Sequence, residues 1–230
     1  MEQHIPRAWS GEANEPSVLS GYIPALASRR LVGRQEPLRA PEGERLAAVV
    51  LFADISGFTA LTERLAGTGP SGVEELTELL NGCFGDLVQL VADHGGDVVK
   101  FAGDALLGLW PADEDLPALT AQAASCALTM QRILHANELA AGTLLSIRIG
   151  IGAGPLTAAH LGGERGRWEF VVGGPAVIQA CAAEQLARPG DVVLSPEARP
   201  PACPAHRGCA PQRERSRRRV RSHPRPAARP

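Results

Sequence analysis

The sequence contains almost no lysine, no long hydrophobic run and no regular cysteine framework. Lys100 is the only lysine in a 230-residue chain that holds 23 lysine and arginine residues. No apolar run approaches the roughly 20 residues that a membrane-spanning helix needs, and the first residues lack the basic and apolar regions of a signal peptide. The five cysteines have no even spacing, as expected for reduced thiols. These absences predict a cytoplasmic protein with no membrane partner.

Charge is divided unevenly along the chain. Ten arginines and one acid, Glu214, lie in residues 198–230, which therefore carry 10 − 1 = +9 of the formal total of −2, and residues 1–197 carry −11. Residues 198–230 contain no Leu, Ile or Phe, so they cannot bury enough apolar surface to fold. We expect a disordered Arg/Pro-rich tail, a composition that a frameshift would also produce. Without interleaved aromatic residues, such a tail predicts no specific nucleic-acid binding.

The rest of the chain divides into a leader and one domain. Residues 1–44 mix proline, glycine and charge, and predict a partly ordered leader. Residues 45–197 predict a single domain that begins with a continuous apolar run, typical of a strand buried on both faces. Within it the patterns predict helices at 56–66, 73–92, 116–140 and 175–187, and strands at 46–54, 97–101, 105–110, 144–153, 168–172 and 191–194.

The order of these elements indicates the fold class. Strand, helix, helix, strand, strand, helix, strand predicts an α+β sandwich of the ferredoxin-like βααββαβ type. We expect the helices to cover one face of a mainly antiparallel sheet. Ser56 is placed to cap the first helix.

Two aspartates stand at the tips of predicted strands. Asp54 ends the first apolar strand, and Asp104 lies in the predicted turn between the strands at 97–101 and 105–110. Two neighbouring carboxylates repel each other unless a divalent cation lies between them, and Mg²⁺ binds one or two carboxylates together with phosphate oxygens. The segment Ser56, Gly57, Phe58 and Thr59 follows Asp54 at a helix start, where backbone N–H groups stabilise phosphate. Adjoining metal and phosphate sites are therefore predicted.

Each of these residues also has an ordinary structural interpretation. Asp54 could be a strand-end or N-cap acid, and Asp104 a turn residue. Lys100 could be a surface lysine whose stem packs against the strand. Together, in segments otherwise apolar, the three charges favour a functional site.

The segments 52–59 (FADISGFT) and 100–107 (KFAGDALL) resemble the metal-binding motifs of class III nucleotidyl cyclases. Within that class the chain is most similar, from Leu46 to Ser195, to the first domain of soluble, bicarbonate-responsive adenylyl cyclases and their bacterial tandem relatives. The resemblance implies the nucleotidyl cyclase fold and conversion of ATP to cyclic AMP and pyrophosphate at a dimer interface. It implies two Mg²⁺ or Mn²⁺ ions held by Asp54, Asp104 and the Ile55 carbonyl, with Lys100 at the purine end of the site. Because Lys100 stands where guanylyl-type domains place an acid, ATP is favoured over GTP.

The chain also departs from the family pattern. The family's purine-selecting residue, asparagine and transition-state arginine align with Val171, Ile178 and Ala182, and the bicarbonate-binding arginine with Cys181. None of the first three side chains forms hydrogen bonds, so the resemblance implies a half-site that needs a complementary cyclase domain. The alternative is a catalytically inactive module that binds nucleotide or metal. Arg148, Arg165 and Arg167 could replace the missing cations, but we expect them to be surface groups.

Overall fold

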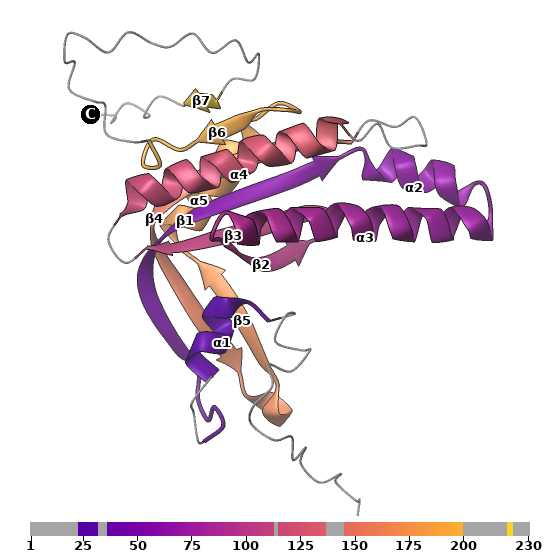
Figure 1. The fold of residues 1–230 in the computed structure, drawn as a ribbon. Coiled ribbons are helices and arrows are strands. Elements are labelled where there is room, and N and C mark those ends of the chain that lie inside the picture. Colours follow the sequence, from indigo (N-terminus) through magenta and orange to yellow (C-terminus); the bar gives the residue numbers. More distant parts are fainter. Residues whose placement is uncertain (1–22, 32–35, 113–114, 137–144, 200–219, 223–230) are drawn as a thin grey trace, which may run out of the picture.

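The computed structural model describes residues 23–31, 36–112, 115–136, 145–199 and 220–222. Its centre is a seven-stranded mixed sheet with the strand order β2-β3-β1-β4-β6-β7, and β5 pairs with β4 beyond this path (Figure 1). The strands are β1 (Glu42–Ser56), β2 (Asp97–Ala102), β3 (Ala105–Ala112), β4 (Ser146–Gly162), β5 (Trp168–Gly173), β6 (Val192–Leu194) and β7 (Val220–Ser222). The helices are α1 (Ala25–Leu31), α2 (Phe58–Ala66), α3 (Pro70–Asp93), α4 (Leu116–Ala136) and α5 (Pro175–Gln185), with a 3₁₀ turn at Glu164–Gly166.

The predicted α+β class and element order are confirmed. The chain runs β1-α2-α3-β2-β3-α4-β4, and β1 pairs antiparallel with both β3 and β4. β6 and β7 join the sheet in parallel, which makes it mixed. β1 occupies the centre, as its apolar run predicted, with four consecutive residues, 48–51, fully buried.

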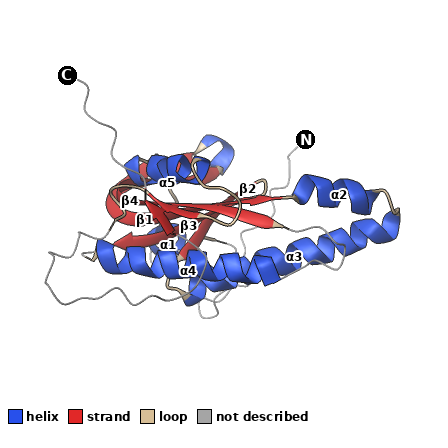
Figure 2. Ribbon diagram, turned by 90° about the horizontal axis from the view of Figure 1, so that it is seen from above, coloured by secondary structure: helices blue, strands red, loops and turns tan. Residues whose placement is uncertain are grey.

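The expectation that helices cover one face of the sheet is wrong. Seen from above, α3 and α4 lie on one side of the sheet and α5 on the other (Figure 2). Along β1, Val49 and Leu51 belong to the main core with residues of α3 and α4, whereas Ala48 and Val50 pack with residues of α1 and α5. A strand that is apolar at every position has two faces to bury, and this pattern requires cover on both sides.

Helix α5 approaches the sheet closely because β4 carries glycines beneath it. A Cβ atom at Gly150 would lie 2.0 Å from the Ala180 carbonyl oxygen and 2.3 Å from the Glu184 nitrogen, and one at Gly152 would lie 2.3 Å from the Ala176 oxygen. These are backbone atoms that no rotamer change can move away. The position of α5, and of every side chain it carries toward β4, therefore depends on these glycines.

Replacing Gly150 with alanine is expected to lower the free energy of unfolding by about 3 kcal/mol, because a methyl group at this contact forces helix and strand apart. The matched control is Gly85→Ala in the interior of α3, where an added Cβ meets nothing within 4 Å. That change should instead raise stability by about 0.5–1 kcal/mol, since alanine loses less backbone entropy than glycine in a helix. Urea unfolding of both variants measures the two shifts. Equal effects would show that the close contact does not limit stability.

Several boundaries differ from those predicted from sequence. β4 extends well past residue 153, through Gly162, to pair with β5. Residues 220–222, predicted to be disordered, form β7 beside β6; the rest of the Arg-rich tail, from 200 to 219 and from 223 to 230, lies outside the described residues. In the predicted leader, α1 packs on the domain through buried Leu26, and the Asp97 carboxylate accepts a hydrogen bond from the Leu26 N–H at 3.4 Å.

No helix in the described ranges is long and apolar enough to cross a membrane.

Candidate functional site

The two predicted metal-binding acids lie at the same end of the sheet. Asp54 on β1 is opposite Ala105 of β3 on one side and opposite Arg148 of β4 on the other. Asp104 lies in the two-residue turn from β2 to β3, where Gly103 has a φ of 66°. The Ile55 N–H donates a hydrogen bond to the Asp104 carbonyl at 3.3 Å, so the turn is held directly against the end of β1.

Arg148 is part of this site, and the surface interpretation predicted for it is wrong. Its guanidinium donates a hydrogen bond to Asp54, and the same Nη2 atom lies 3.1 Å from Oε1 of Glu184 on α5. The Arg148 side chain is only 33% exposed. By contrast, Arg165 and Arg167 are exposed, as predicted.

Sequence reasoning also missed Glu184. A signal was present for both residues: Arg148 interrupts the apolar strand 147–151, and Glu184 follows four small residues on α5. Glu184 is 6% exposed, and charged residues are rarely buried to this extent unless paired. An arginine and a glutamate at such positions indicate a buried ion pair.

The pKa values of both groups reflect this arrangement. The hydrogen bond to Asp54 raises the pKa of the Arg148 guanidinium, against the opposing effect of burial. Burial raises the pKa of the Glu184 carboxyl, and the nearby Arg148 charge lowers it in part. One guanidinium thus serves two carboxylates, Asp54 and Glu184, with a third, Asp104, close enough to act on it electrostatically.

The donors at the end of β1 fit a magnesium or manganese site. Carboxylate and carbonyl oxygens are the ligands these ions prefer, and Mg²⁺ commonly takes only one or two carboxylates, the remainder being water and phosphate oxygens. No group of three or more His, Cys, Asp or Glu side chains able to hold a metal ion occurs among the described residues. A site formed here would therefore draw part of its coordination from a bound polyphosphate. It would also need Asp54, which Arg148 occupies in this conformation.

The segment predicted to bind phosphate connects β1 to α2. β1 runs through Ser56, and the N-cap of α2 is Gly57, with a φ of 105°, so the prediction that Ser56 caps the helix is wrong. A left-handed φ favours glycine, which explains why the cap has no side chain. Gly57 therefore provides no side-chain hydrogen bond to the N–H groups of the first turn. The side chains of Ser56, Phe58 and Thr59 lie outside what the structure describes, and their role stays a prediction.

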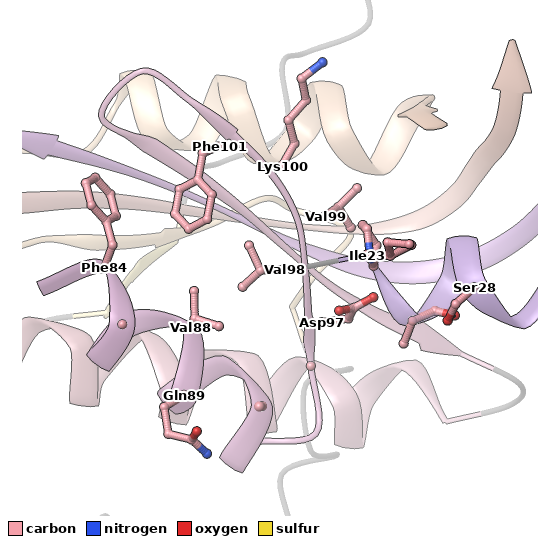
Figure 3. A pocket seen from close by; sticks show the side chains of 15 residues that line it. Ile23, Ser28, Phe84, Val88, Gln89, Asp97, Val98, Val99, Lys100 and Phe101 are labelled. Atoms are coloured by element: carbon pink, nitrogen blue, oxygen red, sulfur yellow. The ribbon is translucent and has the colours of Figure 1, made fainter. Parts of the chain in front are cut away.

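The charged partner of Lys100 in the described structure is on β5. Lys100 forms a 3.1 Å ion pair with Glu169 of β5, and its side chain is 56% exposed. Lys100 is among the residues that line a groove of about 740 Å³ between α1, α3 and β2, and Figure 3 shows its amino end extending away from the other lining side chains. That groove is lined mainly by apolar side chains, and neither Asp54 nor Asp104 borders it.

The three positions that depart from the family pattern lie on β5 and α5. Val171 is half-buried, Ala182 is exposed, and Ile178 is 68% exposed. Ile178 and Ala182 are four residues apart, so they lie on one face of α5. This face is open to a partner in the described structure.

Comparison with known proteins connects this geometry with a family. The model of the "Adenylate and Guanylate cyclase catalytic domain" family matches residues 43–201. Adenylate cyclase type 10 of Rattus norvegicus is 38% identical over 151 residues, which are 64% of this chain and 9% of that protein. An adenylate cyclase of Mycobacterium tuberculosis is 28% identical over 181 residues, 79% of this chain and 39% of that protein. The chain thus spans well under half of the length of these relatives.

Solved structures share the fold. The adenylyl cyclase CyaB of P. aeruginosa superposes with a TM-score of 0.58 at 26% identity, over 68% of this chain and 80% of that one. The catalytic core of a rhodopsin-guanylyl cyclase with converted specificity, in complex with ATPalphaS, superposes with a TM-score of 0.57 at 28% identity, over 68% and 82% of the two chains.

Proposed function

Because the chain belongs to the family of adenylate and guanylate cyclase catalytic domains, we propose that it converts ATP to cyclic AMP and pyrophosphate, as a half-site that needs a complementary cyclase domain. The observation that carries this proposal is the placement of Asp54 and Asp104 at one end of the sheet, linked by the Ile55 backbone. The relatives named as adenylate cyclases support ATP as the substrate. A first-domain role in a tandem cyclase and a cytoplasmic location belong to the same proposal.

Each residue of the site has a role in this proposal. Asp54, Asp104 and the Ile55 carbonyl would hold two Mg²⁺ or Mn²⁺ ions, which when bound neutralise the triphosphate and activate the ribose 3′-hydroxyl. That oxygen loses its proton and bonds to the α-phosphorus as the bond to pyrophosphate breaks. The helix α2 begins at Phe58, four residues after Asp54, and the N–H groups of its first turn would bind phosphate oxygens. Lys100, exposed on β2, would contact the purine across the dimer interface.

A second domain is needed because three positions on β5 and α5 carry side chains that cannot form hydrogen bonds. Val171, Ile178 and Ala182 occupy the positions where a complete partner would read the purine and stabilise the transition state. Aliphatic side chains stabilise no developing charge, and a missing arginine of this kind lowers phosphoryl-transfer rates by several orders of magnitude. A homodimer of this chain would therefore have its metal ligands but lack its charge-stabilising groups.

A second candidate is a regulatory module that binds metal or nucleotide without turnover. Two observations favour it: the aliphatic residues on α5, and the pairing of Asp54 with Arg148. It shares the fold and dimer interface with the first proposal and differs only in turnover.

Cyclic AMP formation from ATP with Mg²⁺ or Mn²⁺ tests the two proposals. The full chain is assayed alone and then mixed with a cyclase domain that carries the asparagine and arginine missing here. We expect turnover only in the mixture. Turnover by the chain alone would refute the half-site, and its absence from a mixture that forms heterodimers would favour the regulatory module. Replacing ATP with GTP in the same assay measures the substrate preference.

A further inference from the structure

We propose that Glu184 is a positioning residue that receives Arg148 when a divalent cation binds Asp54, so that Arg148 is an internal counter-ion which the metal displaces. The inference rests on the proposed metal site at Asp54. It adds a residue from α5, the helix that covers β1 and β4 on one face of the sheet, to the control of that site.

The contacts of Arg148 define two positions for one cation. Its Nη2 atom is hydrogen-bonded to Asp54 Oδ2 and lies 3.1 Å from Glu184 Oε1. Asp54 and Arg148 are directly opposite each other on β1 and β4, whereas Glu184 approaches from the helix above. A small rotation of the guanidinium is therefore enough to exchange Asp54 for Glu184 as the principal partner.

In the described structure, Arg148 and Glu184 are close but do not yet form a hydrogen bond. Glu184 Oε1 and Arg148 Nε are both buried, and neither has a hydrogen-bond partner among the described residues. The 3.1 Å approach of Nη2 to Oε1 brings the charges together without forming a hydrogen bond. Buried polar atoms without partners cost free energy, so a movement of the guanidinium toward Glu184 that pairs them is favoured as soon as Asp54 is taken.

The backbone holds Glu184 in place for this role. The Glu184 nitrogen lies only 2.3 Å from where a Cβ of Gly150 would be, and Gly150 is two residues along β4 from Arg148. α5 thus cannot slide relative to the strand without opening this contact. The carboxylate stays within reach of Arg148 in both positions.

Electrostatics connects the exchange to metal binding. A divalent cation at Asp54 repels a guanidinium bound to the same carboxylate, so the two cations compete for Asp54. Without Glu184, the hydrogen-bonded partner of Arg148 would be Asp54 alone. A metal ion that binds Asp54 would then displace the guanidinium without a second carboxylate to receive it. Glu184 therefore raises the metal affinity of Asp54 through Arg148.

Titration of the full chain with Mn²⁺, followed by the electron paramagnetic resonance of the free ion, tests this. Glu184→Gln should weaken Mn²⁺ binding roughly tenfold, but by less than about threefold in an Arg148→Gln background, since the effect acts through Arg148. Equal weakening in both backgrounds would indicate a direct effect of the Glu184 charge and would overturn the proposal. So would unchanged binding in Glu184→Gln. Glu164→Gln, an exposed acid in the turn before β5, controls for the loss of one charge.

A second variant covers the case in which Arg148→Gln does not fold. Glu184→Asp keeps the charge but withdraws the carboxylate from Arg148 by one methylene, so binding should again weaken several-fold. Wild-type affinity in a folded Glu184→Asp chain would overturn the proposal. Asp54→Asn separates the hypothesis of a metal site at Asp54 from the hypothesis that Glu184 receives Arg148. If Mn²⁺ binding does not depend on Asp54, the proposed metal site is refuted, and this inference with it. Binding that depends on Asp54 but not on Glu184 refutes this inference alone.

Discussion

Asp54→Asn is expected to reduce cyclic AMP formation by about 10³-fold or more when the chain is assayed with a complementary cyclase domain, because an amide oxygen without charge holds a divalent cation poorly at the reacting phosphate. The substitution is nearly isosteric. It removes the hydrogen-bonded ion pair with Arg148, but Glu184 remains 3.1 Å from that guanidinium, so Arg148 retains an anionic partner. The chain should stay folded while its activity is lost.

The control for this experiment is Asp86→Asn on the exposed side of α3, which removes one charge at a position outside the site. It should leave turnover within about twofold of the wild-type chain, as expected for a surface substitution. Circular dichroism and urea unfolding of both variants establish that the comparison is between folded proteins. If Asp54→Asn retained full turnover in the mixture, the assignment of Asp54 as a metal ligand would be wrong.

The fold was predictable because the elements have strong local patterns. The 15 residues of β1 include a run that is apolar at every position, and α3 has apolar residues at helical spacing through most of its length. Each pattern identifies its element without knowledge of the others. The packing of α5 was not predictable in this way, because it depends on a contact between Gly150 of one element and Ala180 of another.

The candidate site was predictable in part for a similar reason. Asp54 lies at the end of one recognisable apolar run and Asp104 in the turn between two recognisable strands, and the antiparallel pairing of β1 with β3 then brings both to the same end. Arg148 was assigned to the surface because arginine in isolation prefers exposure. Only the register of β4 against β1 shows that it lies opposite Asp54. Residues that act through partners distant in sequence require the tertiary structure.

Restoring the missing groups should convert the half-site into an active homodimer. The double substitution Ile178→Asn with Ala182→Arg is expected to raise cyclic AMP formation by the chain alone by about 10²-fold or more, since an arginine that stabilises a phosphoryl-transfer transition state contributes about 10³-fold or more in related chemistry. The increase is measured with ATP and Mn²⁺ at a protein concentration where dimers form.

The structure favours this experiment because the substituted positions have room. Ile178 is 68% exposed and Ala182 is exposed, so polar side chains there bury no unpaired charge. The matched control is Gln122→Arg, which adds a cation at an exposed position of α4, on the other side of the sheet from the aligned positions. It should leave turnover unchanged, whereas Ala182→Arg alone should give part of the increase. A folded, dimeric double variant with no increase would show that the deficit lies elsewhere, at Val171 or in the pairing of Arg148 with Asp54, and would favour the regulatory module over the cyclase.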